Sequence, residues 1–315
     1  MYKIGFDVGG TNIAAGLLDA SLEIVERSNV PFPHDKSAQE ITVLLSNMVR
    51  ELLEREHIAQ TELECIGIAV PGSIDSLGDI VLDAYNLHFH KVPLRILMQE
   101  HFSGVPVFLV NDANAAALAE LHKGVFVGCK TAVLLTLGTG VGGGLILDGK
   151  MFNGGNNSGV ELGHMIMAHG MDLCTCGQRG CIETRCSATW LAQAGRTMAA
   201  QHSDGLMHQR ANGKAEDIDA KIVIECAREK DRGAVEIFDN YVDALSSVLA
   251  SLINLLDPEV IALGGGVSLA GDFLFEPLRI LAEKKCFFAE YKGQIVPAAM
   301  GNDAGIIGAA MLMHN

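Results

Sequence analysis

Three cysteines fall within the eight residues CTCGQRGC, at positions 174–181. Thiolates gathered this closely suit a Zn²⁺ ion, which takes four nitrogen or sulfur ligands in a tetrahedron. The spacing leaves His164 and His169 as alternatives for the fourth ligand. Thiol–disulfide exchange is a weaker interpretation, because the segment contains no C-x-x-C pair. The segment therefore predicts a structural zinc site in which three thiolates come from Cys174, Cys176 and Cys181.

The other five cysteines do not share this clustering. Cys65, Cys129, Cys226 and Cys286 are isolated, and Cys186 lies near the cluster but outside its pattern. Free cysteines of this kind usually behave as small buried hydrophobes. We expect all five to serve packing.

Three glycine-rich turns could hold phosphate groups. They are GGTN at 9–12, GTGVGGG at 138–144 and GGG at 264–266. The second contains G-x-G-x-x-G, but the LILDGK that follows indicates a strand, whereas a dinucleotide-binding fingerprint requires a helix. Glycine still lets several backbone N–H groups approach one oxyanion, and a threonine hydroxyl adds a donor. The candidate nucleotide-binding residues are Gly9, Gly10, Thr11, Asn12, Gly138, Thr139, Gly140, Gly264, Gly265 and Gly266.

Asp7 ends the first expected strand, immediately before the GGTN turn. A carboxylate in this place could hold Mg²⁺, which neutralises the charge of nucleotide phosphates. It could instead accept hydrogen bonds from the amides of the turn. We favour the magnesium role.

The pair Asn111–Asp112 follows an expected strand, VPVFLV, and opens an alanine-rich helix. Asn and Asp are common at helix N-termini, where they accept hydrogen bonds from backbone amides. From the residues alone, capping is therefore a better interpretation than catalysis.

The elements that position these residues alternate between strand and helix, which predicts an α/β protein. Two segments, IGFDVGGTNIAAGLLD at 4–19 and VLLTLGTGVGGGLILD at 133–148, share one plan of strand, glycine turn, strand and aspartate. Such a repeat predicts two domains built on one pattern, with two glycine hairpins facing each other across a cleft.

Length and charge restrict the class of protein. The 315 residues suffice for two domains of roughly 150 residues each. A formal net charge of −15 argues against nucleic acid or an anionic membrane as a partner. The most apolar stretch, TAVLLTLGTGVGGGLIL, is interrupted by glycines and fits two strands better than a membrane helix. The chain begins with a strand pattern rather than an export leader, so we expect a cytoplasmic location.

Seven segments together resemble one protein family. In order they are DVGGTN, AVPG, NDANAAALAE, LGTGVGGG, GVELGH, CTCGQRGCIE and LGGGV, spread from residue 4 to about residue 310. This order is similar to that of the ROK family of sugar kinases and sugar-responsive repressors, and most similar to its bacterial glucokinases. The resemblance implies a two-domain actin-like ATPase (ribonuclease H-like) fold with ATP and sugar in the interdomain cleft. The smaller domain would span 1–118, completed by a C-terminal helix at 303–315, and the larger one 119–302 would contain the zinc loop.

The resemblance also implies roles for individual residues. The ion would be structural Zn²⁺, with His164 completing the three thiolates. Asp112 would be the general base that accepts the proton of the glucose 6-hydroxyl as this oxygen attacks the γ-phosphate of ATP, with Mg²⁺ on the nucleotide. The implied sugar-binding residues are Gly72, Asn111, Asp112, Glu161, His164 and Glu183.

Several alternatives remain open at this point. A sugar-responsive regulator of the same family would carry an added N-terminal helix-turn-helix, and the first expected strand leaves no room for one. Kinases for fructose, allose, N-acetylmannosamine or N-acetylglucosamine share the same motifs. A non-catalytic actin-like protein would not need the cysteine segment. The resemblance further implies a homodimer or homotetramer. His88 and His90 form an H-x-H pair that we expect at a loop near the sugar or on plain surface.

Overall fold

The computed structural model describes residues 1–155, 159–167, 172–202 and 205–314. The chain divides into two compact units. The first unit comprises Met1–Lys130, Gly144–Val160 and Ala299–Asn315, and the second comprises Thr131–Gly143 and Glu161–Ala298. The predicted domain boundaries, at 118/119 and 302/303, stay a prediction, because compactness alone does not define a part that folds by itself.

The first unit is built on a five-stranded sheet with the strand order β3-β2-β1-β4-β8. Strands β1, β2 and β3 form the expected antiparallel meander, whereas β4 and β8 run parallel to β1. The bounds are β1 Tyr2–Val8, β2 Asn12–Leu18, β3 Ile24–Pro31, β4 Leu63–Val70 and β8 Val107–Asn111.

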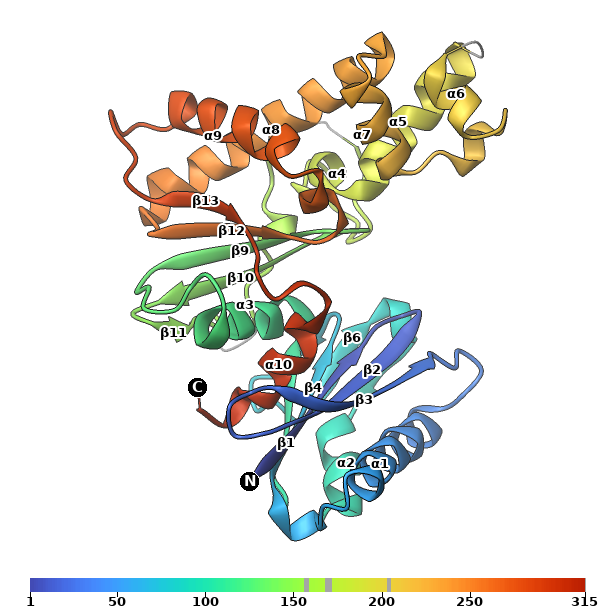
Figure 1. The fold of residues 1–315 in the computed structure, drawn as a ribbon, viewed down its shortest axis with the longest axis vertical. Coiled ribbons are helices and arrows are strands. Elements are labelled where there is room, and N and C mark those ends of the chain that lie inside the picture. The colour runs from blue at the N-terminus through green and yellow to red at the C-terminus, as the bar shows by residue number, and fades with distance from the viewer. Residues whose placement is uncertain (156–158, 168–171, 203–204, 315) are drawn as a thin grey trace. The chain divides into compact units, whose positions relative to one another are not determined.

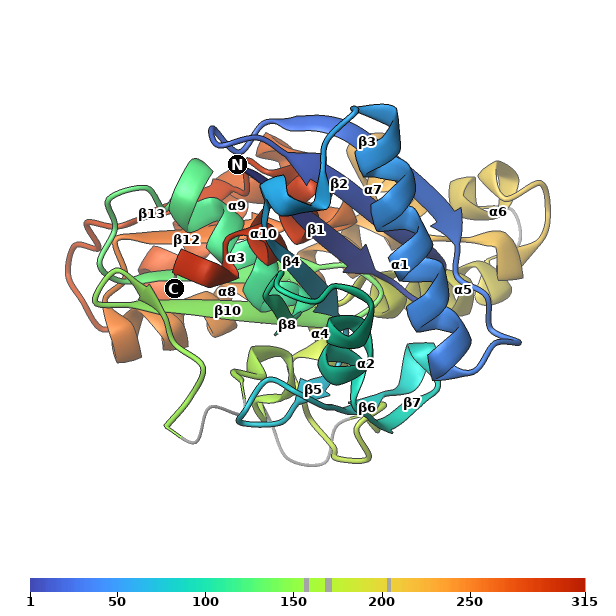
Figure 2. The same cartoon turned by 90° about the horizontal axis from the view of Figure 1, so that it is seen from below.

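Two pairs of helices cover the two faces of this sheet. Helices α1 (Ala38–Arg55) and α2 (Leu94–His101) pack against the alternate strand residues Ile4, Phe6 and Val8. Figures 1 and 2 show α1 and α2 beside the first sheet. Helices α3 (Asp112–Lys123) and α10 (Ala304–Ala310) occupy the other face and pack against each other. A side chain on Gly5 of β1 would collide with the backbone of α10, so glycine is required for this close approach.

A small antiparallel sheet inserts between β4 and α2 in the chain. It consists of β5 (Ser73–Ile74), β6 (Val81–Ala84) and β7 (Phe89–Val92), in the order β5-β6-β7. The sequence did not indicate these short strands. They matter for the site because β6 packs tightly against the turn at Gly72.

A second five-stranded sheet repeats the first in its order, β11-β10-β9-β12-β13. Strands β9, β12 and β13 are parallel, and β10 and β11 are antiparallel. Position by position, the strand pair β9 and β10 corresponds to β1 and β2, and the parallel strands β12 and β13 correspond to β4 and β8. The repeat predicted from residues 4–19 and 133–148 is thus confirmed. The bounds are β9 Ala132–Leu137, β10 Val141–Leu147, β11 Lys150–Met151, β12 Val260–Gly264 and β13 Gln294–Pro297.

Helices of the second unit pack on and beside these strands. The long helix α8 (Arg232–Leu256) packs against α9 (Asp272–Lys285), and Figure 1 shows both over the second sheet. Helices α5 (Ala188–Gln201) and α7 (Ala220–Arg228) pack against α8 and each other, next to the short helices α4 (Glu183–Cys186) and α6 (Leu206–Arg210). The predicted α/β class is confirmed. Within the described residues, no helix is long and apolar enough to cross a membrane.

Candidate active site

Asn111 and Asp112 lie where β8 meets α3 in the first unit. Asn111 is the N-cap: its side-chain oxygen accepts hydrogen bonds from the amides of Ala113 and Asn114, at 2.9 and 3.2 Å. Asp112 is the first residue of the helix and is exposed, and its carboxylate accepts from the Ala113 amide at 2.8 Å. A helix N-terminus favours the ionised form of a carboxylate. Capping, the interpretation from residues alone, is therefore correct for Asn111, and it leaves the Asp112 carboxylate accessible.

The Gly72 turn fixes the orientation of Asn111. The side-chain amide of Asn111 donates to the Gly72 carbonyl at 3.0 Å. Gly72 has φ +88°, and a Cβ there would collide with the Asp83 carbonyl of β6. Only glycine fits this backbone conformation and this contact without strain. The turn therefore holds the side chain that caps α3, and a direct contact of Gly72 with a sugar stays a prediction.

The first glycine turn closes through its own backbone. The Gly9 amide donates to the Asn12 carbonyl at 2.9 Å, and the Thr11 carbonyl accepts from the Phe32 amide at 2.8 Å. Gly10 packs against Asn86, which the sequence analysis did not single out. Asn86 precedes β7 and carried no recognisable signal of a role at this turn.

Asp7 lies near the end of β1, next to this turn. Its carboxylate packs against Gly305 of α10, where a side chain would collide with it. Burial raises the pKa of the Asp7 carboxyl above its ordinary value. A buried carboxylate loses the solvation of its charge, and a cation bound next to Asp7 would compensate for that loss. The Gly9 amide of the turn donates to the Asn12 carbonyl instead of to Asp7.

The second glycine turn, residues 138–140, is held from outside. The Gly138 amide donates to Gly140 at 3.1 Å. Three further bonds involve Glu183 and the first two residues of α5. They are Val141 N–H to Glu183 Oε2 at 3.1 Å, Ala188 N–H to the Gly138 carbonyl at 2.8 Å, and Thr189 Oγ1 to the Thr139 carbonyl at 2.6 Å.

The third glycine turn follows β12. Gly265 has φ +80°, and a Cβ there would collide with the backbone of Leu137, the last residue of β9. A Cβ on Gly266 would meet no atom within 4 Å, and Gly266 lines a cavity. Two of the three predicted turns thus meet within the second unit.

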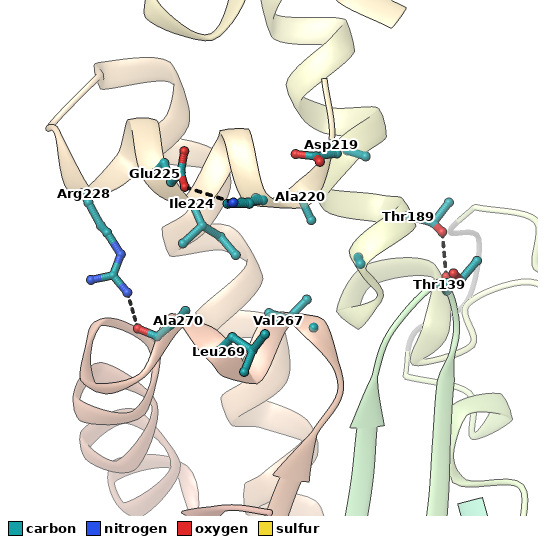
Figure 3. Close-up of a pocket in the computed structure, with 14 residues that line it drawn as sticks. Thr139, Thr189, Asp219, Ala220, Ile224, Glu225, Arg228, Val267, Leu269 and Ala270 are labelled. Atoms are coloured by element: carbon teal, nitrogen blue, oxygen red, sulfur yellow. Dashed lines mark hydrogen bonds and ion pairs between the residues drawn. The ribbon is translucent and has the colours of Figure 1, made fainter. Parts of the chain in front are cut away.

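That cavity has a volume of about 620 Å³ and lies wholly within the second unit. Thr139 and Thr189 form one side, as Figure 3 shows. Helix α7 forms a second wall, and the turn after β12 forms a third with Leu269 at its surface. Volumes of this order are typical of small-molecule sites. The complete lining is Thr139, Ala188, Thr189, Ala192, Asp219, Ala220, Lys221, Ile224, Glu225, Arg228, Gly266, Val267, Leu269 and Ala270.

The charged groups of the α7 wall are engaged with the protein. Asp219 caps α7 by accepting from the Ile222 amide at 2.8 Å. The Glu225 Oε1 atom lies 3.9 Å from Nζ of Lys221, which is one turn earlier on the helix. The Arg228 guanidinium donates to the Ala270 carbonyl, the bond drawn in Figure 3. The cavity therefore offers apolar surface and glycine-turn backbone between paired charges. This wall could not be predicted from sequence, because its residue types are those of any amphipathic helix.

The cysteine segment forms a compact ligand cluster in the second unit. One ligand atom each from His164, Cys174, Cys176 and Cys181 lies within 4.8 Å of all the others. The sulfurs of Cys176 and Cys181 are 3.6 Å apart, and Cys174 Sγ lies 3.6 Å from His164 Nδ1. Sulfurs bound 2.3 Å from a tetrahedral Zn²⁺ are about 3.8 Å apart, whereas a disulfide needs about 2.05 Å. The donor set and its spacing fit Zn²⁺.

Two predictions about nearby residues have different outcomes. His164 lies in the cluster, whereas its rival His169 lies outside the described residues. Cys186 is buried, and burial raises the pKa of its thiol to about 12. A thiol in that state is a poor nucleophile and metal ligand, which agrees with the packing role expected for Cys186.

The segment that contains Glu161 and His164 packs along the start of β10. Side chains at Gly163 and Gly143 would collide with the Val141 carbonyl and with Leu162 respectively, so both glycines permit a close approach. The Glu161 side chain is exposed. Of the predicted sugar-binding residues, Glu161, His164 and Glu183 belong to the second unit, and Gly72, Asn111 and Asp112 to the first.

Comparisons with known proteins agree on the family. The chain matches the ROK family model over residues 3–315. It is 35% identical to a glucokinase of Thermotoga maritima over 317 residues, covering 98% of this chain and 96% of the relative. It is 34% identical to a glucokinase of Halalkalibacterium halodurans over 314 residues, covering 99% and 94%.

Among solved structures, the chain is similar to a ROK family glucokinase from Streptomyces griseus in complex with glucose and AMPPNP. The TM-score is 0.84 and the identity is 32%, with 99% of each chain covered. The expected two-domain actin-like ATPase fold is thereby confirmed. The match over nearly the full length, in sequence and in fold, shows that this chain belongs to the ROK family.

Proposed function

We propose that the protein is an ATP-dependent hexose kinase that transfers the γ-phosphoryl group of ATP to the 6-hydroxyl of glucose. The observation that carries the proposal is the 620 Å³ cavity, in which two of the predicted phosphate-binding turns meet through Thr139 and Gly266. The glucokinase relatives support glucose as the acceptor. The Streptomyces griseus structure, with glucose and AMPPNP bound, supports this pair of substrates.

The sugar is held by hydrogen-bonding side chains. Asn111, Glu161, His164 and Glu183 bind its hydroxyl groups, with a backbone contact from the Gly72 turn. Each hydroxyl that loses its partner leaves a desolvated polar group, and this cost distinguishes one hexose from its epimers. Asn111 is already oriented for this role by its bond to the Gly72 carbonyl.

Asp112 acts as the general base of the transfer. Its carboxylate accepts the proton of the 6-hydroxyl while that oxygen forms a bond to the γ-phosphorus. The bond between this phosphorus and the β–γ bridging oxygen breaks, so ADP leaves with the electron pair. Asp112 returns the proton to solvent afterwards. The exposed carboxylate at the start of α3 supports this role, because a helix N-terminus favours the ionised form of a carboxylate.

Two metal ions complete the proposed site. Asp7 and the nucleotide phosphates hold Mg²⁺, which supplies charge neutralisation on the phosphates when bound. His164, Cys174, Cys176 and Cys181 hold Zn²⁺, which supplies a rigid fold for a loop with little core of its own. Metal analysis of the purified protein should find about one zinc per chain.

A coupled assay of ADP release tests the function. Purified protein is given ATP, Mg²⁺ and a panel of glucose, fructose, allose, N-acetylmannosamine and N-acetylglucosamine. We expect the highest kcat/KM with glucose. A preference for another sugar would correct the acceptor alone, whereas absence of turnover with every sugar, despite binding of one, would support a regulator.

We also expect a cytoplasmic homodimer or homotetramer without a nucleic-acid partner, which light scattering and a DNA-binding assay would check.

A further inference from the structure

Glu183 lies between the cysteine cluster and the glycine turn at 138–140. One carboxylate oxygen accepts from the Thr175 hydroxyl at 2.9 Å, and the other accepts from the Val141 amide at 3.1 Å. We propose that Glu183 is a positioning residue that couples the two, so that Zn²⁺ in the cluster tightens nucleotide binding in the cavity beside the turn. The inference rests on the proposed function in taking the ligand of that cavity to be ATP.

On the cluster side, Glu183 is connected in three ways. Thr175 stands between two ligands in the chain, Cys174 and Cys176, and Glu183 follows the ligand Cys181 by two residues. The Cys174 sulfur also lies 3.5 Å from the Glu183 carboxylate. An ion that fixes the three sulfurs therefore fixes the Thr175 hydroxyl relative to Glu183. Without the ion, the described part of the loop keeps its backbone bonds, such as the one from the Gly177 amide to the Cys174 carbonyl, but loses the ion that joins the three sulfurs.

On the turn side, the carboxylate occupies the space next to Gly140. A Cβ on Gly140 would collide with the Glu183 carboxylate, so the turn and the side chain are in close contact. The Val141 amide, which donates to Glu183, begins β10 directly after the turn. A displaced Glu183 thus leaves the Val141 amide without its acceptor and removes one of the contacts that hold the turn.

The same segment holds the two other residues of the turn. The amide of Ala188 donates to the Gly138 carbonyl, and the Thr189 hydroxyl donates to the Thr139 carbonyl. Both carbonyls are thereby bonded to the first two residues of α5, and these two residues line the cavity together with Thr139. Because Thr139 lines the cavity, a change at Glu183 changes the surface that receives the phosphates.

The chain has a built-in probe of this connection. Trp190 is its single tryptophan and follows Thr189. The indole stacks on Tyr241 with ring centres 6.3 Å apart, and the Arg185 guanidinium carbon lies 5.5 Å from its ring centre. Its fluorescence therefore reports on the segment between cluster and turn, independently of any catalytic turnover.

The test measures binding of ADP without sugar, with the full-length protein either loaded with Zn²⁺ or stripped by a chelator. Calorimetry gives the dissociation constant, Trp190 emission follows zinc rebinding, and metal analysis gives the zinc content. We expect removal of zinc to weaken ADP binding of the wild-type protein about tenfold, a usual size for coupling between two sites.

Four variants locate the coupling. In Glu183→Ala, ADP binding should be weak in both states and should differ less than about twofold between them. Glu183→Gln should restore most of the zinc effect, because its amide oxygen can accept from Val141 while its NH₂ group donates to Thr175. Thr175→Val should bind ADP as the stripped wild type does, even with zinc present. Thr197→Val, which removes an exposed hydroxyl of α5 that bonds within its own helix, should behave as wild type.

The results separate this inference from the proposed function. Equal ADP affinity with and without zinc, an undiminished zinc effect in Glu183→Ala and Thr175→Val, or a cluster that binds no zinc would each overturn the coupling, whereas the wild-type protein would still phosphorylate glucose. A zinc-loaded wild type that binds no ADP at all would overturn the proposed function itself. Thermal melts of each variant identify any that fails to fold, and Thr175→Val then decides alone.

Discussion

The two five-stranded sheets share one topology but carry different chemical groups at equivalent strand ends. In the first sheet, β1 ends at Asp7–Val8 and β8 ends at Asn111, followed by Asp112. In the second sheet, β9 is followed by Gly138 and β13 by Ala298. The first sheet thus presents carboxylates and an amide, and the second presents glycine backbone and small side chains.

This difference matches two kinds of chemistry. Carboxylates suit a cation and a proton in transit, but they repel phosphate groups. Backbone N–H groups of glycine turns suit phosphate and cannot accept a proton. A repeated frame in which both copies carry a glycine turn, but only the first adds acids beside it, is therefore suited to a reaction between a hydroxyl and a polyphosphate.

The two hairpin turns also differ in what holds them. The first turn closes through Gly9 and Asn12 and accepts one further amide, from Phe32. The second depends on Glu183 and the start of α5, next to the cysteine cluster. A metal site can therefore influence the second turn, while the first is independent of it.

The largest effect is expected from the acid that distinguishes the first sheet. Asp112→Asn removes the only proton acceptor we assign to the transfer, so kcat should fall by about 10³-fold or more. Glucose binding by calorimetry should stay measurable, because Asn keeps the shape of the side chain and one acceptor oxygen. The coupled ADP-release assay measures the loss.

Asp272→Asn is the matched control for this variant. Asp272 is also the exposed first residue of a helix, α9, so the same change removes an equivalent charge from an equivalent position. Its kcat should stay within about twofold of wild type. Comparable losses in both variants would assign the effect to helix-terminus charge and remove Asp112 from the mechanism.

The next largest effect is expected at the glycine backbone of the second sheet. Gly265→Ala forces a left-handed conformation on a residue with a Cβ and brings that Cβ against the backbone of Leu137. We expect a loss of about 2 kcal/mol or more in stability, together with at least tenfold weaker ADP binding. Denaturant unfolding and calorimetry provide both measurements.

Gly78→Ala separates the two causes. Gly78 has φ +73°, and an added Cβ there meets no atom within 4 Å. This variant should therefore show only the conformational cost, about 1 kcal/mol, with unchanged ADP affinity. An equal stability cost at both positions would mean that the contact of Gly265 with Leu137 adds no strain, and unchanged ADP affinity in both variants would remove this turn from the binding surface.

A smaller effect on stability, with opposite sign, is expected at Asp7. Burial raises the pKa of this carboxyl, so its ionised form destabilises the folded state above that raised pKa, and the penalty disappears as the pH falls through it. Asp7→Asn should therefore melt at a higher temperature than wild type at pH 8, with the difference shrinking in acid. Turnover should drop by about 100-fold if Asp7 holds Mg²⁺.

Asp19, at the far end of the same hairpin, provides the contrast. The Ser21 hydroxyl and the Glu23 amide lower its pKa, so it stabilises the fold above its ordinary pKa and that contribution is lost as the pH falls through the lowered value. Asp19→Asn should thus melt lower than wild type at neutral pH and retain activity. A lower melting temperature for Asp7→Asn as well would contradict the role of burial at Asp7.

The central strands of both sheets, their repeat and the cysteine cluster were predictable from sequence. Apolar runs broken by glycine placed β1, β2, β9 and β10, and the similarity of 4–19 to 133–148 predicted the repeat. The cysteine segment predicted its ligand cluster, because metal ligands need particular residue types at short spacing. Local signals of this kind do not depend on the rest of the chain.

Other features were not predictable, because they arise from contacts between distant residues. The strands β5 to β7 are short and partly polar, so neighbours rather than local pattern determine them. The contact of Glu183 with Val141 joins residues 42 positions apart. Asp219 and Arg228 line the cavity only because α7 packs beside the glycine turns.

The smallest expected effect concerns the arginines that secure an edge strand in each sheet. Arg27 of β3 binds Asp303 at 2.8 Å, with 54% and 38% of the two side chains exposed, whereas Arg279 of α9 donates to the Ile295 carbonyl of β13, also at 2.8 Å. Arg27 lowers the pKa of Asp303, so this pair stabilises the fold above the ordinary carboxyl pKa and loses that contribution as the pH falls through the lowered one.

Asp303→Asn should cost no more than about 1 kcal/mol in denaturant unfolding at neutral pH and low salt, and nothing in 1 M salt, because the charges are exposed and screened. Arg279→Gln loses a bond to a neutral carbonyl, so its cost should vary little with salt and not with acid between pH 3 and 7. If the two costs respond alike to salt and acid, the first sheet depends on charge at its edge no more than the second does, and the contrast between the sheets is confined to the strand ends that face the chemistry.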